Sequence, residues 1–290
     1  MGGTKTVACL IALALACGCA KGPRPIVVGS KNFTEQLVLG EILAQQLERK
    51  LGQKVERKLN LGGTLLAHEA LVNGEIDLYP EYTGTALTAI LKLPPSSDPK
   101  NVLSEVRAAY EKRWRLEWLA PFGFNNSFAM VVRGDEARRG GLRTISDAAR
   151  VKRDWVMGAG YEFIERPDGF HGLVKAYGLG TKGQIETMDL GLLYQALEQR
   201  KVDMIAASAT DGMLSVLDVT VLQDDRHYFP PYEAAPVVRG EALAAYPGMR
   251  QALEELAGRL TDREMQKLNY ELDGKHRALA EVAREFLEGR

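Results

Sequence analysis

Short apolar runs that alternate with segments of helical spacing constrain the fold of this chain most strongly. The segment 34–50 places leucines at helical spacing and follows a candidate helix cap at Asn32. The runs that predict strands are residues 26–29, 55–61, 76–79, 128–132, 155–158, 202–206 and 219–222. Strands that alternate with helices are typical of α/β proteins with largely parallel sheets, so we expect that fold class.

The end of the chain is expected to be helical. Thr261 and Glu264 have the spacing of a capping box, which predicts a helix through Leu272. Residues 275–287 predict a further helix.

The first residues predict export. One early lysine precedes an apolar run from Val7 to Ala16, and small residues follow it, as in a secretory signal. The run is too short to span a bilayer, which needs about 20 apolar residues. The segment ending at Cys19 resembles a lipobox, so we expect residues 1–19 to be a lipoprotein signal with a retained, lipidated Cys19. Processing at Cys17 and a plain signal peptide are the alternatives.

The cysteine count excludes an internal disulfide in the exported chain. All 3 cysteines of the sequence lie at positions 9, 17 and 19. A diacylated Cys19 would hold the protein on the outer surface of a membrane, in the periplasm or outside the cell, because two acyl chains anchor durably.

The amino-acid composition is typical of a globular protein with no excess of basic residues. The hydrophobic content is 46% and the formal net charge is −1, which suits one large core or two smaller ones. Lysine and arginine are interspersed with acidic residues along the chain, so no nucleic-acid partner is expected.

Common enzyme motifs are absent from the sequence. It contains no Gly-x-Ser-x-Gly, no His-Glu-x-x-His and no phosphate-binding Gly-x-x-x-x-Gly-Lys-Ser/Thr segment. The 4 histidines are far apart and lack the spacing of metal ligands. No catalytic residue, cofactor or metal is therefore expected, although distant residues can converge in a fold.

Aromatic and hydroxyl side chains cluster in segments at strand ends and helix starts. These segments are residues 30–36, 78–85, 122–128 and 229–239. In open α/β sheets, ligands bind at such ends. Together the segments resemble the substrate-binding proteins of ABC importers for glycine betaine, choline and related osmoprotectants.

The resemblance implies a type II periplasmic-binding-protein fold, with two α/β lobes, a ligand cleft and two hinge crossings. The crossings are expected near residues 125–131 and 228–237. Residues 20–127 and 232–290 would form lobe 1, and residues 128–231 would form lobe 2. Ligand contacts to both lobes favour the closed state in such proteins.

The family's ligand chemistry accounts for the residue types. A quaternary ammonium has no N–H to donate, so it is held against aromatic ring faces, each worth about 0.5–2 kcal/mol. The resemblance implies that Tyr82 and Tyr232 are cage rings and that Gln36 and Thr85 contact the other end of the ligand. Taken singly, the tyrosines could be core or turn residues, Thr85 a helix cap and Gln36 an ordinary first-turn residue.

Two cage positions depart from the family's pattern. Phe128 keeps a ring without its hydroxyl, and Ser208 loses the ring altogether. Binding is then weak, another aromatic fills the gap, or the ligand is larger than glycine betaine. Tyr161 is a candidate replacement wall, and Glu162 and Arg166 are candidate charged contacts. A surface salt bridge is the alternative for these two charges.

We therefore expect a lipid-anchored, monomeric solute-binding protein that delivers a quaternary-ammonium solute, such as glycine betaine, choline or carnitine, to an ABC permease and ATPase. A larger trimethylammonium compound such as ergothioneine is one alternative. A sensing protein coupled to a membrane receptor and an exported enzyme are the others.

Overall fold

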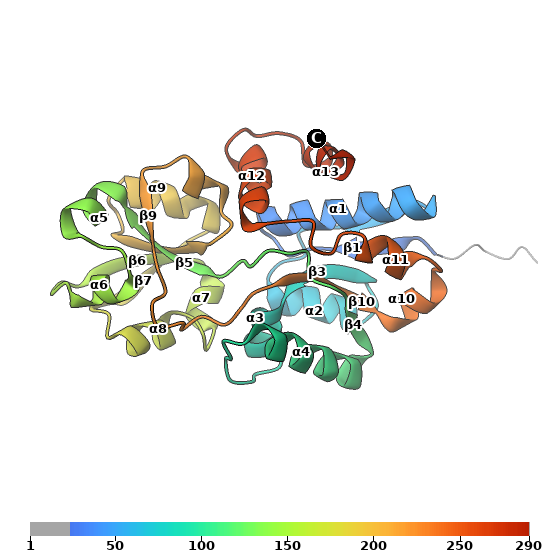
Figure 1. Ribbon diagram of the computed structural model, residues 1–290, viewed down its shortest axis with the longest axis horizontal. Coiled ribbons are helices and arrows are strands. Elements are labelled where there is room, and N and C mark those ends of the chain that lie inside the picture. The colour runs from blue at the N-terminus through green and yellow to red at the C-terminus, as the bar shows by residue number, and fades with distance from the viewer. Residues whose placement is uncertain (1–23, 290) are drawn as a thin grey trace, which may run out of the picture.

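The computed structural model describes residues 24–289, and the chain forms two lobes side by side (Figure 1). The signal segment and the predicted lipidation site at Cys19 lie outside the described residues. Among those residues, no helix is long and apolar enough to cross a bilayer.

Each lobe is built on a five-stranded sheet. The first sheet has the order β2-β1-β3-β10-β4, with β1 (Ile26–Gly29), β2 (Val55–Lys58), β3 (Leu78–Tyr82), β4 (Leu116–Trp118) and β10 (Ala234–Arg239). The second has the order β7-β6-β8-β5-β9, with β5 (Phe128–Arg133), β6 (Trp155–Ala159), β7 (Thr181–Thr187), β8 (Met204–Ser208) and β9 (Val219–Leu222). The expected division into two α/β lobes is confirmed.

Helices cover both sheets. The first lobe carries α1 (Thr34–Leu51), α2 (Thr64–Val72), α3 (Thr83–Thr85), the π-helical turn η1 (Ala86–Ile90), α4 (Pro99–Trp114), α10 (Gly240–Ala245), α11 (Met249–Glu254), α12 (Asp262–Asp273) and α13 (Leu279–Glu288). The second carries α5 (Gly134–Gly140), α6 (Ile145–Arg150), α7 (Tyr161–Glu165), α8 (Phe170–Tyr177), α9 (Leu193–Glu198) and the 3-10 turns η2 (Leu190–Leu192) and η3 (Gly212–Ser215).

The sequence pattern explains the packing of α1. Its leucines at positions 39, 43 and 47 are fully buried, and they share a core with Ile26 and Val28 of β1. This burial of one helix face against a sheet is the interaction that an amphipathic pattern predicts. At the other end of the chain, Thr261 and Glu264 form the predicted capping box of α12.

Two extended segments connect the lobes, as expected. Residues 119–127 lead from β4 to β5, and residues 223–233 lead from β9 to β10. The segments pair with each other, because Asn125 and Glu233 form an antiparallel bridge and the Asn126 N–H donates to the Tyr232 carbonyl at 3.1 Å. Backbone pairing of the two crossings gives the lobes a common hinge.

Several expectations about individual elements were wrong. Both sheets are mixed rather than largely parallel, since β10 runs antiparallel to β3 and β4, and β5 runs antiparallel to β8 and β9. The missed strands are β4, β7 and β10. A short β4, a polar β7 and a proline inside β10 weaken the apolar pattern that predicts a strand.

Helix starts also differed from expectation at two places. Phe33 rather than Asn32 is the N-cap of α1, and it provides no side-chain cap within the described residues. The last helix begins at Leu279 rather than near residue 275.

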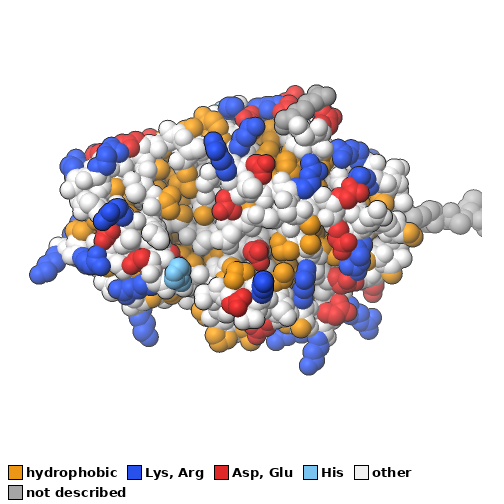
Figure 2. All heavy atoms as spheres, in the orientation of Figure 1, with side chains coloured by type: hydrophobic (Ala, Val, Ile, Leu, Met, Phe, Trp, Pro, Cys, Tyr) orange, Lys and Arg blue, Asp and Glu red, His pale blue; other side chains and the backbone are white. Residues whose placement is uncertain are grey.

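The surface carries interspersed basic and acidic side chains over the face seen in Figure 2, in line with the mixed composition.

Candidate functional site

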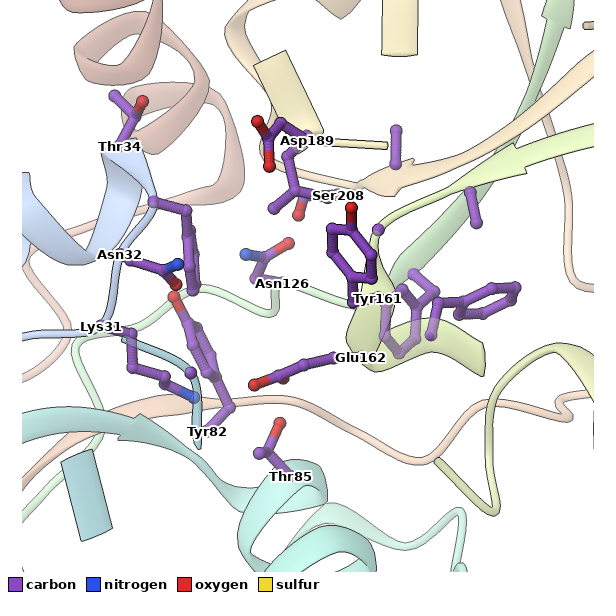
Figure 3. A pocket seen from close by; sticks show the side chains of 18 of the residues that line it. Lys31, Asn32, Thr34, Tyr82, Thr85, Asn126, Tyr161, Glu162, Asp189 and Ser208 are labelled. Atoms are coloured by element: carbon purple, nitrogen blue, oxygen red, sulfur yellow. The ribbon is translucent and has the colours of Figure 1, made fainter. Parts of the chain in front are cut away.

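A cavity of about 530 Å³ lies between the lobes. Its walls come from both sheets and from the crossings, so residues far apart in sequence face one another across it (Figure 3). Of the predicted site residues, the structure brings Tyr82, Thr85, Phe128, Tyr161, Arg166, Ser208 and Tyr232 to its lining. Gln36 is not among the lining residues.

Tyr82 ends β3 and is 4% exposed. Its hydroxyl donates to Glu35 Oε1 at 2.7 Å, and its ring stacks with Phe33 at a centroid distance of 6.3 Å. The Lys31 ammonium lies 5.0 Å from the centroid of the Tyr82 ring. The ring is therefore held rigidly and already contacts a cation of the protein.

Glu35 fixes Tyr82 from behind the cavity. Its buried carboxylate accepts hydrogen bonds from Tyr82, from Asn126 at 2.8 Å, from Asn269 at 3.2 Å and from Thr210. These donors belong to the first lobe, a crossing, α12 and the second lobe. Burial raises the pKa of Glu35, although the hydrogen bonds from these donors oppose the rise.

Gln36 is fully buried beside this junction. Its Oε1 accepts the Lys31 N–H at 3.2 Å, and it thereby supports the loop that carries Lys31. The Lys31 ammonium donates to Glu81 at 2.6 Å and to Thr64 at 3.2 Å. A direct contact between Gln36 and a ligand remains a prediction.

Phe128 and Tyr232 form an aromatic corner of the cavity. Their ring centroids are 5.7 Å apart with an interplanar angle of 80°. Phe163 packs against Phe128 in the same edge-on manner at 4.8 Å. Edge-to-face pairs of this kind hold aromatic rings in place, so the corner is preformed.

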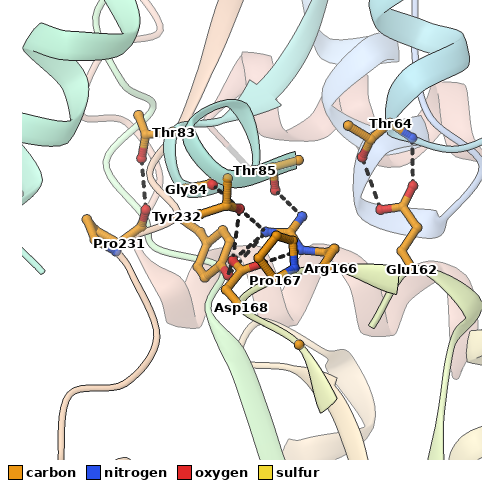
Figure 4. A network of polar contacts seen from close by, with 12 residues as sticks. Thr64, Thr83, Gly84, Thr85, Glu162, Arg166, Pro167, Asp168, Pro231 and Tyr232 are labelled. Carbon is orange, nitrogen blue, oxygen red and sulfur yellow. Dashed lines mark hydrogen bonds and ion pairs between the residues drawn. The ribbon is translucent and has the colours of Figure 1, made fainter. Parts of the chain in front are cut away.

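Arg166 lies behind this corner, in a network drawn in Figure 4. Its guanidinium forms a two-point ion pair with Asp168, at 3.0 Å from Nε and 2.7 Å from Nη2. It also donates to Thr85 Oγ1 at 3.0 Å and to the Tyr232 hydroxyl at 3.2 Å. The alternative of a surface salt bridge is wrong for Arg166, which is 7% exposed because both lobes enclose it.

Glu162 is not in a surface salt bridge either. Its carboxylate accepts the Thr64 N–H at 2.6 Å and the Thr64 hydroxyl at 3.0 Å, across the cleft from the opposite lobe. Thr85, for its part, lies within α3 and accepts from Arg166 rather than capping the helix.

Ser208 and Tyr161 both line the cavity from the second lobe. Ser208 lies opposite Phe128 in the pairing of β8 with β5, and both residues line the cavity. Tyr161 begins α7 and is 65% exposed, so its ring is the most accessible of the lining aromatic rings. Asp189 lies beside Ser208 in the lining (Figure 3), and Thr34 lines the cavity from α1 of the first lobe.

The charge around the cavity favours a cation. Lys31 and Arg166 are each paired with a buried carboxylate. Glu162 and Asp189 add two further carboxylates to the lining. Residues 24–289 hold no group of histidine, cysteine and acidic side chains that could bind a metal ion.

Sequence reasoning missed several residues of the site. Lys31 and Glu35 lie inside the motif 30–36, but their partners are distant in sequence and no spacing identifies them. Asp168 lies two residues beyond Arg166, where a buried ion pair has no distinguishing local pattern.

Comparison with known proteins finds the same family that the sequence motifs resemble. The family model of the substrate-binding domain of the ABC-type glycine betaine transport system matches residues 24–289. The carnitine transport binding protein of Listeria monocytogenes is 36% identical over 91% of this chain and 86% of its own length. The ergothioneine transport permease/ergothioneine binding protein of Helicobacter pylori is 37% identical over 91% of this chain but only 47% of its own length.

A solved structure supports the fold assignment. The crystal structure of a glycine betaine/carnitine/choline ABC transporter protein superposes with a TM-score of 0.77 at 33% identity, covering 91% of this chain and 98% of that one. The expected type II periplasmic-binding-protein fold is thereby confirmed.

Proposed function

Because the chain belongs to the family of substrate-binding domains of ABC-type glycine betaine transport systems, we propose that its cavity binds a quaternary-ammonium solute for delivery to an ABC permease and ATPase. Members of this family are extracytoplasmic binding components of importers rather than enzymes. The solute class proposed for this chain includes glycine betaine, choline and carnitine.

The observation that carries the proposal is the convergence of aromatic rings from both lobes on one cavity. Tyr82 comes from the first sheet, Phe128 and Tyr161 come from the second lobe, and Tyr232 comes from a crossing. Ring faces attract a cation that cannot hydrogen-bond, by about 0.5–2 kcal/mol per contact. The two basic groups of the lining are each paired with a buried carboxylate, so the remaining carboxylates, Glu162 and Asp189, favour a positively charged solute.

A carboxylate on the solute has a candidate partner in Arg166. The Arg166 side chain lines the cavity. Its Nη1 carries two N–H groups, one of which donates a hydrogen bond to Thr85 Oγ1. Glycine betaine and carnitine could use this donor, whereas choline has no group that requires it.

The missing ring at Ser208 favours a second candidate, a longer trimethylammonium compound. The small side chain of Ser208 leaves space beside Asp189, where hydrogen-bonding groups of a longer solute could lie. The similarity to the ergothioneine-binding relative extends over 91% of this chain. Ergothioneine carries a trimethylammonium group, a carboxylate and a ring with N–H donors, which suits this combination of walls.

Further features remain proposals. They are a lipid anchor on Cys19 at the outer face of the membrane, a monomeric state, and lobe boundaries at residues 127/128 and 231/232. The anchor is supported by the lipobox-like segment, and the boundary at 127/128 is supported by strand β5 starting at Phe128.

Isothermal titration calorimetry of the mature protein tests the proposed function. The panel is glycine betaine, choline, carnitine, proline betaine and ergothioneine, with proline as a control that lacks a quaternary nitrogen. We expect saturable binding of at least one quaternary compound and none of proline. Binding of proline alone, or of no compound in the panel, would overturn the proposal.

A further inference from the structure

The N-terminus of α2 is capped by a side chain from the opposite lobe. Glu162 of α7 places one carboxylate oxygen 2.6 Å from the Thr64 nitrogen and the other 3.0 Å from the Thr64 hydroxyl (Figure 4). The N-cap residue of α2 is Gly63, which supplies no side-chain cap within the described part of the chain. The capping function thus comes from a residue about a hundred positions away.

The local backbone is adapted to this contact. A Cβ atom added at Gly63 would lie 2.5 Å from Glu162 Oε1, and the other atom within reach belongs to the same carboxylate. Gly63 has a φ of −76°, which any residue can adopt. A side chain at position 63 would therefore displace the Glu162 carboxylate from this place, although it would not strain the backbone.

Electrostatics also favour an ionised Glu162 at this position. Desolvation opposes ionisation, but the nearby Lys31 ammonium, the Thr64 hydrogen bonds and Arg166 together lower the pKa of Glu162. The free N–H groups and the dipole at a helix N-terminus attract an anion as well. The carboxylate thus completes a chain of contacts from Glu81 through Lys31 and Thr64.

We propose that Glu162 is a closure latch, whose bidentate contact with Thr64 across the cleft sets the equilibrium between the open and closed lobes. Thr64 belongs to the first lobe and Glu162 to the second, so the contact exists only when the lobes are together. In an open conformation both groups are bonded to water. The latch stabilises the closed state through a contact between the two lobes.

This inference rests on the proposed function, because closure matters for a solute held between the lobes. A latch changes the population of the closed form, so it changes the apparent affinity for every solute by the same factor. A residue that contacts the solute changes the ranking of solutes. This difference separates the two roles for Glu162.

The experiment combines Glu162→Ala, Gly63→Ala and the double variant. Glu165→Ala, which removes another exposed carboxylate of the same helix, is the matched control. Small-angle scattering of the ligand-free protein reports the open and closed populations, and calorimetry gives the dissociation constant for each solute that binds. Thermal melts verify that each variant is folded.

We expect both single variants to increase the radius of gyration of the ligand-free protein and to weaken all solutes by a common factor of about ten, the value of a charge-assisted contact of this kind. Gly63→Ala should cause no further loss of affinity in the Glu162→Ala background, since both substitutions remove the same contact between Glu162 and Thr64. The control should match the wild type.

Unchanged scattering in both single variants would overturn the latch, whatever the solute proves to be. So would a Glu162→Ala effect confined to particular solutes with no effect of Gly63→Ala, since that pattern identifies a solute contact. Failure of every solute to bind leaves the scattering result intact and concerns the proposed function alone.

Discussion

The guanidinium of Arg166 lies 5.4 Å from the ring centroid of Tyr232 and donates a hydrogen bond to the hydroxyl of the same residue at 3.2 Å. Tyr232 also donates its hydroxyl hydrogen to Asp168. An internal cation, a ring and a carboxylate thus form one buried unit at the wall of the cavity. The Tyr232 ring, which the family resemblance predicts to contact the solute, is therefore oriented by charged groups of the protein itself.

Replacing Arg166 should separate the solutes by their charge distribution. In Arg166→Lys the positive charge remains, but the two-point pairing with Asp168 and the reach to Thr85 are lost. We expect glycine betaine and carnitine to bind about tenfold more weakly, and choline to change less, because choline has no carboxylate. Calorimetry with the three solutes measures the difference. Equal losses for all three would show that Arg166 acts only on the shape of the wall.

Restoring a ring at position 208 should reverse the departure from the family's pattern. In Ser208→Tyr a further ring face would cover the solute, worth about 0.5–2 kcal/mol. We expect a small solute such as glycine betaine to bind about two- to thirtyfold more tightly and a longer one such as ergothioneine to bind less well. Ser208→Ala is the size control and should leave both affinities nearly unchanged. Tighter binding of both solutes by Ser208→Tyr would contradict the assignment of spare space to this position.

Removing Glu35 should destabilise the junction of the lobes. In Glu35→Ala, donors on Tyr82, Asn126, Thr210 and Asn269 lose their shared acceptor. An unsatisfied buried donor costs about 1–3 kcal/mol, so we expect a large decrease in the free energy of unfolding. Urea denaturation measures it. A change below about 1 kcal/mol would mean that water replaces the carboxylate.

His68 should make stability depend on pH. It packs edge-on against Tyr110 and Trp114 at centroid distances of 5.4 and 4.5 Å, and burial lowers its pKa from 6.5 to about 4. A lowered histidine pKa means that the unfolded chain binds the proton more readily, so stability is present above pH 6.5 and falls as pH falls toward 4. Each pKa unit corresponds to about 1.4 kcal/mol.

Urea denaturation at pH 7 and pH 5, with His68→Leu as the comparison, measures this contribution. The wild type should lose more stability than the variant between these pH values. Parallel losses in the two proteins would assign the pH dependence to other groups.

Most strands and helices could be predicted from apolar periodicity, whereas the two-lobed arrangement was implied only by the resemblance to a known family. All seven predicted strand regions correspond to strands of the structure, with shifted ends at positions such as Leu78 and Met204. The missed strand β10 pairs with β3 and β4 through long-range contacts that local sequence does not encode. Pro236 also weakens its strand pattern.

The site was only partly predictable for a different reason. The aromatic residues follow from family motifs, and the structure places them around one cavity. The polar residues that orient them act in pairs such as Glu35 with Thr210 and Arg166 with Thr85, which are far apart in sequence. Their pairing depends on how the two lobes pack against each other, and no local sequence pattern predicts that packing.

The most direct test compares choline with 3,3-dimethylbutan-1-ol, its uncharged isostere, in calorimetric titrations of the wild type and Tyr232→Ala. We expect choline to bind the wild type at least tenfold more tightly than the neutral compound. Tyr232→Ala should remove most of this difference, because the ring attracts the charge of choline rather than its shape. Equal binding of the charged and neutral compounds to the wild type would show that the cavity does not recognise a quaternary cation.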